Sequence, residues 1–201
     1  MLPYHAAGVF TGPDQDYVGN HVVSSYAPNF PALYHALEQA LLCKPGSDIS
    51  QMLLVANAAQ GDLPYAHMEV DVIQSIVPPQ VLMDVPVSGY ALTVEDALTA
   101  LPQANILHLA CHGRQDLVLP FNSGFELVNG RLTLEQLMQV RTSTHAQLAY
   151  LSTCDSAAQD RSCPEEGLNL AATMMHAGFK SVIASMWYVA PCSHSPGLEE
   201  G

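Results

Sequence analysis

The sequence predicts an α/β domain with a mostly parallel central sheet and helices on both of its faces. Short apolar runs recur along the chain, and several of them stop abruptly at glycine, histidine or a small residue. Such runs are typical of strands that are buried on both faces of a parallel sheet. Between them lie stretches in which apolar residues recur with helical spacing. Because strands and helices alternate in one order without an internal repeat, we expect a single domain.

The predicted strands are short runs rich in aliphatic and β-branched residues. They are Val22–Tyr26, Gln51–Ala56, Gln80–Val87, the run from Ile106 to His112, the run from Leu148 to Cys154, and Ser181–Trp187. A hairpin is predicted as well, because Asn129–Gly130 separates the apolar segment Phe125–Val128 from Arg131–Leu132.

The predicted helices have apolar residues three and four positions apart. They are Ala32–Cys43, Ala66–Val77, Thr93–Leu101, Leu134–Val140 and Glu165–Ala177. Thr93 and Thr133 are the expected N-caps, because Asp96 and Gln136 follow them by three positions. Gly178 is expected to end the last helix at its C′ position.

Two of these helices are predicted to turn an apolar face to the core. In the first helix that face consists of Leu33, Ala36, Leu37, Ala40 and Leu41. In the second it consists of Met68, Val72, Ile73 and Ile76. Glu69 and Asp71 of the second helix are then expected to point outward.

Composition limits the classes of partner and the compartment. The chain has 201 residues and a formal net charge of −13, whereas a nucleic-acid-binding protein needs clustered Lys and Arg. No apolar run approaches the ~20 residues of a membrane helix, and no signal-peptide pattern is visible. Five cysteines with irregular spacing are typical of a reducing compartment. We therefore expect a soluble cytoplasmic protein, with no nucleic acid and no membrane as partner.

Two of the predicted strands end in residues that can carry chemistry. The run from Ile106 ends in His112–Gly113, and the run from Leu148 ends in Cys154 followed by small residues. Reactive groups collect at the carboxyl edge of an open parallel sheet, where the strands end. His112 and Cys154 are therefore expected to face one crevice.

Five stretches give the chain a family resemblance. They are Leu2–Gly8, Ser24–Pro28, His108–Gly113, Leu151–Cys154 and Ala177–Trp187. The chain resembles the CHAT domain, a member of the caspase/separase-like clan of cysteine peptidases, and the match runs through nearly its whole length in one order. The resemblance implies a caspase-like three-layer sandwich and a His–Cys dyad that hydrolyses peptide bonds. In this dyad His112 would be the general base and Cys154 the nucleophile.

The chemistry of such a dyad is well defined. An imidazole beside a thiol stabilises the thiolate and later protonates the leaving amine. The backbone N–H groups of Gly113 and Cys154 could then form an oxyanion hole. The alternative is structural: Cys154 would be a small buried hydrophobe and His112 a turn residue, because cysteine is among the most buried residue types. The resemblance favours the dyad.

Several further residues lie near the expected cleft. Asp155 and Asp116 are candidates for a substrate pocket that selects a basic side chain, and Trp187 is a candidate because the resemblance places its strand on the substrate side. Solvated loop carboxylates and a core tryptophan are the alternatives. Cys111 is expected to point into the core, because neighbouring strand residues face opposite ways. His108 is expected to be a semi-buried histidine that does not act in catalysis.

A metal site is the alternative assignment for some of these residues. His108 and His112 are four residues apart, and Cys154 and Cys163 could supply thiolates. The histidines lie on a predicted strand, however, and no Cys-x-x-Cys pair is present. We therefore expect no metal and no cofactor.

The sequence thus predicts a cysteine endopeptidase of the CHAT type that cleaves a protein or peptide substrate. The alternative is a catalytically weak or inactive caspase-like scaffold that acts as an interaction or regulatory module. We expect residues 1–190 to form the domain and 191–201 a disordered polar tail. Relatives continue further after the Trp187 strand, so the domain is expected to be truncated and weakly active. A repeat-containing or regulatory protein is the expected partner.

Overall fold

The central feature of the fold is a four-stranded parallel sheet. The computed structural model describes residues 7–9, 16–42, 50–57, 63–85, 90–114, 116, 118–142, 145–153 and 170–185. The strands lie in the order β3 (Met52–Ala56), β4 (Ile106–Ala110), β8 (Leu148–Ser152) and β9 (Ser181–Ala184). Each neighbouring pair is parallel. Ser181–Trp187 was expected to be a strand, and its described part pairs with the strand that precedes Cys154.

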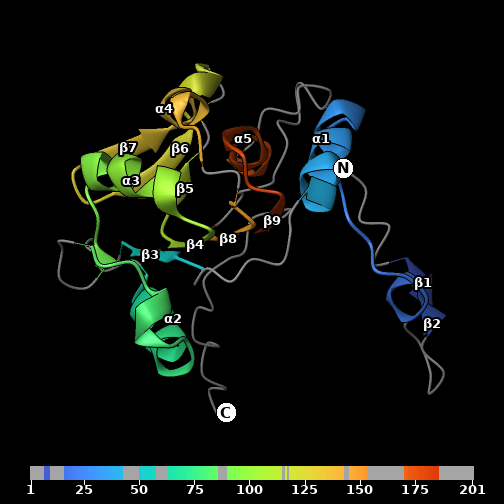
Figure 1. Cartoon of the computed structure of the whole chain (residues 1–201), viewed down its shortest axis with the longest axis horizontal. Coiled ribbons are helices and arrows are strands. Elements are labelled where there is room, and N and C mark those ends of the chain that lie inside the picture. Colours follow the sequence, from blue (N-terminus) through green and yellow to red (C-terminus); the bar gives the residue numbers. More distant parts are fainter. Residues whose placement is uncertain are drawn as a thin grey trace, which may run out of the picture.

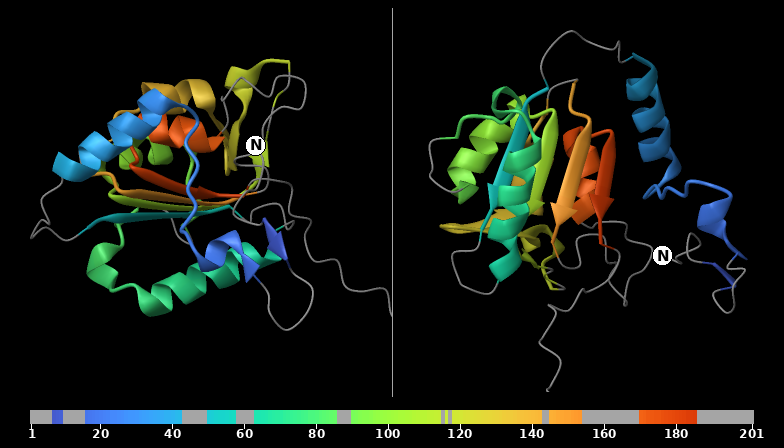
Figure 2. Two further views of the ribbon diagram at one scale, coloured as in Figure 1. Left: turned by 90° about the vertical axis from the view of Figure 1, so that its right-hand side faces the viewer. Right: turned by 90° about the horizontal axis from the view of Figure 1, so that it is seen from below.

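Helices cover this sheet on both faces and complete three layers. α2 (Pro64–Ile76) lies on one face (Figure 1). On the other face lie α3 (Val94–Ala100), α4 (Leu134–Gln139) and α5 (Leu170–Ala177), as Figure 2 shows from two further directions. The α/β class, with a mostly parallel sheet between helices, is therefore confirmed.

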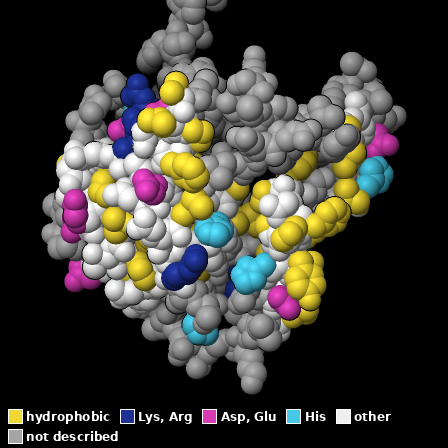
Figure 3. Space-filling model, turned by 90° about the horizontal axis from the view of Figure 1, so that it is seen from above, with side chains coloured by type: hydrophobic (Ala, Val, Ile, Leu, Met, Phe, Trp, Pro, Cys, Tyr) yellow, Lys and Arg dark blue, Asp and Glu magenta, His cyan; other side chains and the backbone are white. Residues whose placement is uncertain are grey.

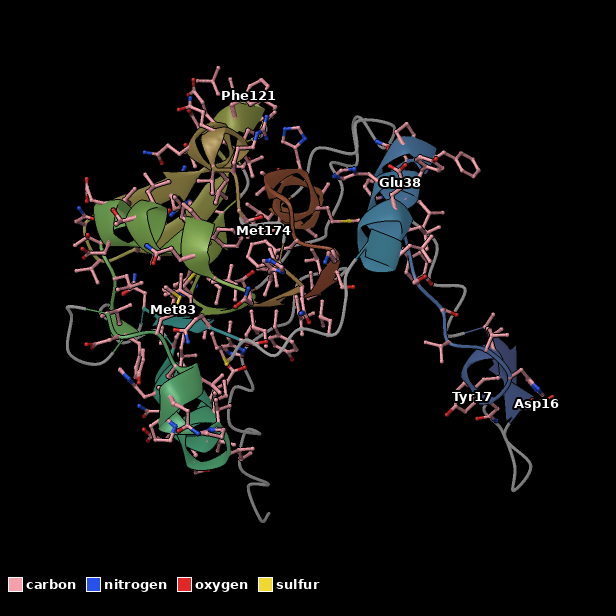
Figure 4. The ribbon with its side chains drawn as sticks, viewed as in Figure 1. Asp16, Tyr17, Glu38, Met83, Phe121 and Met174 are labelled. Atoms are coloured by element: carbon pink, nitrogen blue, oxygen red, sulfur yellow. The ribbon has the colours of Figure 1, made fainter. Side chains whose placement is uncertain are left out.

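The main core fills the layer between the sheet and α3, α4 and α5. Odd-numbered strand residues such as Leu53, Leu107 and Leu151 point to this side and are buried there. Met174 of α5 is fully buried, and Figure 4 shows its side chain directed from α5 toward the sheet. A smaller core on the opposite face consists of Leu54, Ala56, Ala66, Val70 and Ala110. The alternation of strand side chains thus divides the apolar residues between a large core and a small one.

A second, antiparallel sheet projects from the end of β4. It consists of β5 (Gly113–Arg114), β6 (Gly124–Leu127) and β7 (Gly130–Thr133). The turn between β6 and β7 consists of Val128 and Asn129, one residue earlier than the predicted Asn129–Gly130, because Gly130 already pairs with Leu127 as the first residue of β7. Gly130 has a φ of +155°. The hairpin expectation is therefore confirmed.

The predicted helix caps are also present in the structure. The Thr93 side chain accepts a hydrogen bond from the Asp96 N–H at 3.1 Å, and the two residues form a capping box. Thr133 and Gln136 form the same motif at the start of α4. Gly178 follows α5 with a φ of +122°, where a Cβ atom would collide with the Thr142 hydroxyl. The part of the predicted Glu165–Ala177 helix before Leu170 lies outside the described residues.

The predicted strand Val22–Tyr26 is wrong. Residues 22–27 have no regular structure, and Val23 is fully exposed. A strand needs a neighbouring strand to accept and donate its backbone hydrogen bonds. No described strand lies against this segment, so its β-branched composition alone does not produce a strand.

The predicted strand Gln80–Val87 is reduced to a single bridge. Pro79–Val81 forms a 3₁₀ turn, and Leu82 then makes one parallel bridge to Met52. The Met83 N–H donates to the Met52 carbonyl at 2.9 Å; Figure 4 labels Met83 beside β3. Proline fixes φ near −65° and favours a turn at this point, which leaves only a short extended piece. Residues 86–89 lie outside the described part of the chain.

Both amphipathic helices form, but their apolar faces lie differently from the prediction. In α1 (Phe30–Leu42) the side chains of Leu33, Leu37 and Leu41 are exposed, and the helix packs against α5. Figure 3 shows hydrophobic side chains at the surface on this side of the molecule. The described residues before α1 form the two-residue strands β1 (Gly8–Val9) and β2 (Asp16–Tyr17) and a 3₁₀ turn at Val18–Asn20.

The predicted orientation of α2 is only partly right: Ile73 packs against the smaller core and Asp71 is exposed, both as expected. Ala66 and Val70 face the sheet, whereas Met68, Val72 and Ile76 are exposed. Glu69, expected to be outward, reaches a buried histidine of β4. The small side chain of Ala66 and that of Val70 are the fully described buried contacts of α2 with the sheet.

Candidate active site

All four parallel strands end at the same edge of the sheet, and His112 lies at that edge. β4 ends at Ala110 and β8 ends at Ser152, and these two residues are directly paired. His112 follows two residues after the end of β4 and is half-buried. This is the position that the end of the apolar run predicts for it.

The backbone around His112 is held by the hairpin and by β3. The carbonyl of His112 accepts a hydrogen bond from the Glu126 N–H at 2.9 Å, and Gly113 pairs with Phe125. From the other side, the Asn57 N–H donates to the Ala110 carbonyl at 3.0 Å. The Asn57 side-chain amide donates to the Glu126 carbonyl at 2.9 Å. These bonds fix the course of the chain on both sides of His112.

The end of β8 is described up to Thr153. Thr153 is buried, and its carbonyl accepts a hydrogen bond from the Ser185 hydroxyl at 2.8 Å, which links the ends of β8 and β9. Cys154, Asp155 and Trp187 lie outside the described residues. Their assigned roles, and the proposed hydrogen bond from the Gly113 N–H to an oxyanion, therefore stay predictions.

Asp116 organises its own loop. Its Oδ1 accepts hydrogen bonds from the Val118 N–H at 3.0 Å and the Leu119 N–H at 2.9 Å. These two backbone bonds, the one from Leu119 foremost, lower the pKa of the carboxyl. Its own N–H donates to the Ser123 hydroxyl at 2.9 Å. The carboxylate is thus ionised and fixed in the loop that follows Gly113, and its role in a substrate pocket stays a prediction.

Cys111 points into the main core, as predicted. Its side chain is buried among the apolar residues of the larger core, and burial raises the pKa of its thiol well above the usual range. The charge of Glu126 acts in the same direction. A buried thiol with a raised pKa is a poor nucleophile, so Cys111 does not compete for the catalytic role.

His108 is buried on the α2 face and belongs to a polar cluster that sequence reasoning missed. Its Nε2 lies 3.2 Å from Glu69 Oε1, in the geometry of an ion pair rather than of an aligned hydrogen bond. Glu69 Oε2 accepts a hydrogen bond from the Ser152 hydroxyl at 2.9 Å. The imidazole also stacks on Tyr150, with ring centroids 5.0 Å apart. Glu69 of α2 therefore contacts both β4 and β8 on the face of the sheet that α2 covers.

Two opposing effects act on the pKa of His108. Burial lowers it, because the interior disfavours the charged imidazolium, and the Glu69 carboxylate raises it. Burial is the larger effect, so the pKa lies below the usual value and the neutral form is favoured near neutral pH. One sequence signal could have suggested the cluster: a histidine within an otherwise apolar strand needs a polar partner when it is buried.

Two kinds of feature are absent from the described residues. Within those ranges, no three His, Cys, Asp or Glu side chains gather in a way that could hold a metal ion. Over the same part of the chain, none of the helices has the length and apolar character needed to cross a membrane.

Comparison with known proteins identifies one family. The model of the CHAT domain matches residues 1–192, which is most of the chain. No curated protein matches it.

Proposed function

Because the chain belongs to the CHAT family, a family of caspase-like peptidases, we propose that it is a cysteine endopeptidase with a His112–Cys154 dyad. Cys154 is the nucleophile and His112 the general base. The substrate is a protein or a peptide, and the odd number of cysteines supports action in the cytoplasm. A repeat-containing or regulatory protein is the partner that the family resemblance suggests.

The register of β4 and β8 is the observation that supports this proposal most directly. Ala110 pairs with Ser152, an offset of 152 − 110 = 42 positions. His112 and Cys154 have the same separation, 154 − 112 = 42. Neighbouring strands lie about 4.8 Å apart. If the register continues for two residues, the imidazole and the thiol are carried to the same edge at the same level.

The reaction follows from these two groups. His112 takes the proton of the Cys154 thiol, and the thiolate attacks the carbonyl carbon of the scissile peptide bond. The carbonyl oxygen becomes an oxyanion, which the N–H groups of Gly113 and Cys154 stabilise. The C–N bond breaks as the protonated His112 donates its proton to the leaving amine. Water, deprotonated by His112, then hydrolyses the thioester and regenerates the thiol.

The fixed surroundings of His112 support a preorganised base. The hydrogen bonds from Glu126 to the His112 carbonyl and from Asn57 to Ala110 hold its backbone on both sides. Asp116, Asp155 and Trp187 are the residues proposed to line the substrate pocket. The Asp116 carboxylate is ionised in its loop, which suits a basic substrate side chain.

The test is cleavage of a mixed fluorogenic peptide library by the wild-type chain and two variants. Cys154→Ala and His112→Ala should each lower turnover at least about 1000-fold. Cys111→Ala, which removes a cysteine from the adjacent strand, is the matched control and should retain turnover, provided that circular dichroism shows a folded chain. Turnover that persists in Cys154→Ala would refute the dyad. A folded chain without any Cys154-dependent turnover would identify the non-catalytic scaffold instead.

A further inference from the structure

A groove runs between α2 and the sheet, on the face opposite the main core. Its volume is about 570 Å³, and its lining is almost entirely apolar. α2 contributes Met68, Val72 and Ile76, and the strands contribute residues of β3, β4 and β8, among them His108 and Tyr150. The groove lies apart from the strand ends that carry the candidate dyad.

The groove exists because α2 covers only half of this sheet face. The apolar residues that pack against α2 come from β3 and β4. On β8 and β9, the side chains of the same face remain accessible: Tyr150 is 39% exposed, and its paired neighbour Ile183 is 51% exposed. Two strands of a four-stranded sheet are thus open on one side.

The side of α2 that borders the open strands is apolar. Met68, Val72 and Ile76 are 60%, 57% and 74% exposed, and their spacing of four residues places them in one row along the helix. Two strands together are about 10 Å wide, and packed helices lie 8–10 Å apart. The open area therefore has the width of one helix lying alongside α2.

A negative charge lies within this apolar groove. The Glu69 side chain is 32% exposed, and it lines the groove with His108. Burial favours the neutral form of that histidine, so the carboxylate charge is not neutralised there. Among the described residues that line the groove there is no Lys or Arg. His108 Nε2 is itself buried without an aligned hydrogen bond. Only Glu69 is accessible enough to gain a cationic donor from outside.

The required cation does not come from the helices of a second copy. None of the described helices α1 to α5 contains Lys or Arg. Two copies with a net charge of −13 each would also repel one another. The chemistry of the groove therefore favours a different, basic partner.

We propose that this groove binds an amphipathic helix of a partner protein. The apolar face of that helix packs against Met68, Val72, Ile76 and Tyr150. A Lys or Arg on its flank pairs with the Glu69 carboxylate. This mode is the docking of a helix in an apolar groove, with specificity from one charge pair. The inference does not depend on the peptidase activity.

The test is a displayed library of short amphipathic helices, in which the apolar positions are fixed as Leu and the flanking positions vary. It is selected on the wild-type chain and counter-selected on Val72→Asp. Selected peptides should carry Lys or Arg at one flanking position. In fluorescence anisotropy, Val72→Asp should weaken their binding at least tenfold. Glu69→Gln should abolish the preference for the basic peptide over its Gln analogue.

Control variants separate docking from folding. Val128→Asp introduces the same charge at a 47% exposed valine in the β6–β7 hairpin, away from the groove, and should leave binding unchanged. Met68→Gln provides a milder groove variant if Val72→Asp fails to fold. Circular dichroism establishes which variants retain the fold.

Three outcomes would overturn the proposal. The first is a selection that yields no peptide able to distinguish the wild type from the groove variants. The second is concentration-dependent self-association that Val72→Asp abolishes, which would assign the groove to a second copy. The third is resistance of Met68 to brief peroxide oxidation in the free chain, at the level of the fully buried Met174, which would show that the chain itself covers the groove.

Discussion

The two faces of the parallel sheet are built from the same strands but in different ways. Toward α3, α4 and α5, side chains such as Leu53 and Leu107 are completely buried in a large apolar core. Toward α2, the apolar core is small, and the Glu69 cluster lies beside it. The first face supplies most of the apolar burial on which folding depends.

The difference in packing between the two faces shows where this sheet tolerates polar side chains. His108 pairs laterally with Tyr150, and Ala110 with Ser152, so the polar contacts of Glu69 connect the two strands that lead to the candidate dyad. They lie on the thinly covered face, where Glu69 keeps partial contact with water. On the densely packed face an ionised carboxylate would lose its hydration and would strongly destabilise the fold.

The largest effect is expected from truncating neighbouring residues of β3 that point to opposite faces. Leu53→Ala should lower the free energy of unfolding by about 3 to 5 kcal/mol, because rigid packing on that side leaves a cavity. Leu54→Ala should cost about 2 to 3 kcal/mol, because α2 can move toward the sheet and reduce the cavity. Urea denaturation measures both. Equal losses would show that the two faces are equally rigid.

A smaller effect is expected at the helix N-termini. α3 starts with the Thr93–Asp96 capping box, whereas α2 starts after Leu63 without a side-chain cap. Thr93→Ala should lower the free energy of unfolding by about 1 kcal/mol, and Thr93→Ser, which keeps the hydroxyl acceptor, should restore most of it. Thermal denaturation of the three chains checks this. An unchanged midpoint in Thr93→Ala would show that packing alone fixes α3.

The smallest effect is a change in pH dependence. In the unfolded chain a histidine titrates near pH ~6.5, and in the folded chain the pKa of His108 is lower. Between these two values the unfolded state binds more protons, so stability is lost as the pH falls below about 6.5 toward the folded pKa. His108→Phe, which keeps an aromatic ring to stack on Tyr150, should reduce that loss.

Glu69→Gln tests the same pH dependence of stability in a second way. Removing the carboxylate takes away the one influence that raises the pKa of His108. The pKa should then fall further, and the loss of stability should extend to lower pH. Urea unfolding of the wild type and both variants between about pH 5 and 8 is the measurement. Identical profiles in the wild type and His108→Phe would assign the pH dependence to other histidines.

Features determined by neighbouring residues could be predicted from the sequence. The capping boxes and the Gly178 terminus each depend on a few consecutive residues and have their expected form. The hairpin around Asn129 also forms, with its turn shifted by one residue. The central strands were predictable because an apolar run buried on both faces has few alternatives. Val22–Tyr26 failed because pairing depends on a neighbour that composition does not reveal.

The same distinction applies to the candidate site: features set by neighbouring residues were predicted, and contacts between distant residues were not. The position of His112 at the edge of the sheet follows from the end of one apolar run, and the burial of Cys111 follows from strand alternation. Glu69 was missed because its contacts with His108 and Ser152 join residues far apart in the sequence. The rotation of α2 about its own axis, which directs Glu69 toward the sheet, is not encoded in the residues next to Glu69 in the sequence.

Because Cys111 is buried, the chemical modification of its thiol reports when β4 separates from the main core. Alkylating reagents react with thiolates, and this thiol is both shielded and held protonated in the folded state. Its modification therefore requires an excursion in which β4 separates from the main core. At high reagent concentration the labelling rate of Cys111 equals the rate of that opening, and at low concentration it reports the equilibrium population. One native side chain thus permits both the kinetics and the thermodynamics of sheet opening to be followed by alkylation and mass spectrometry, without an engineered probe.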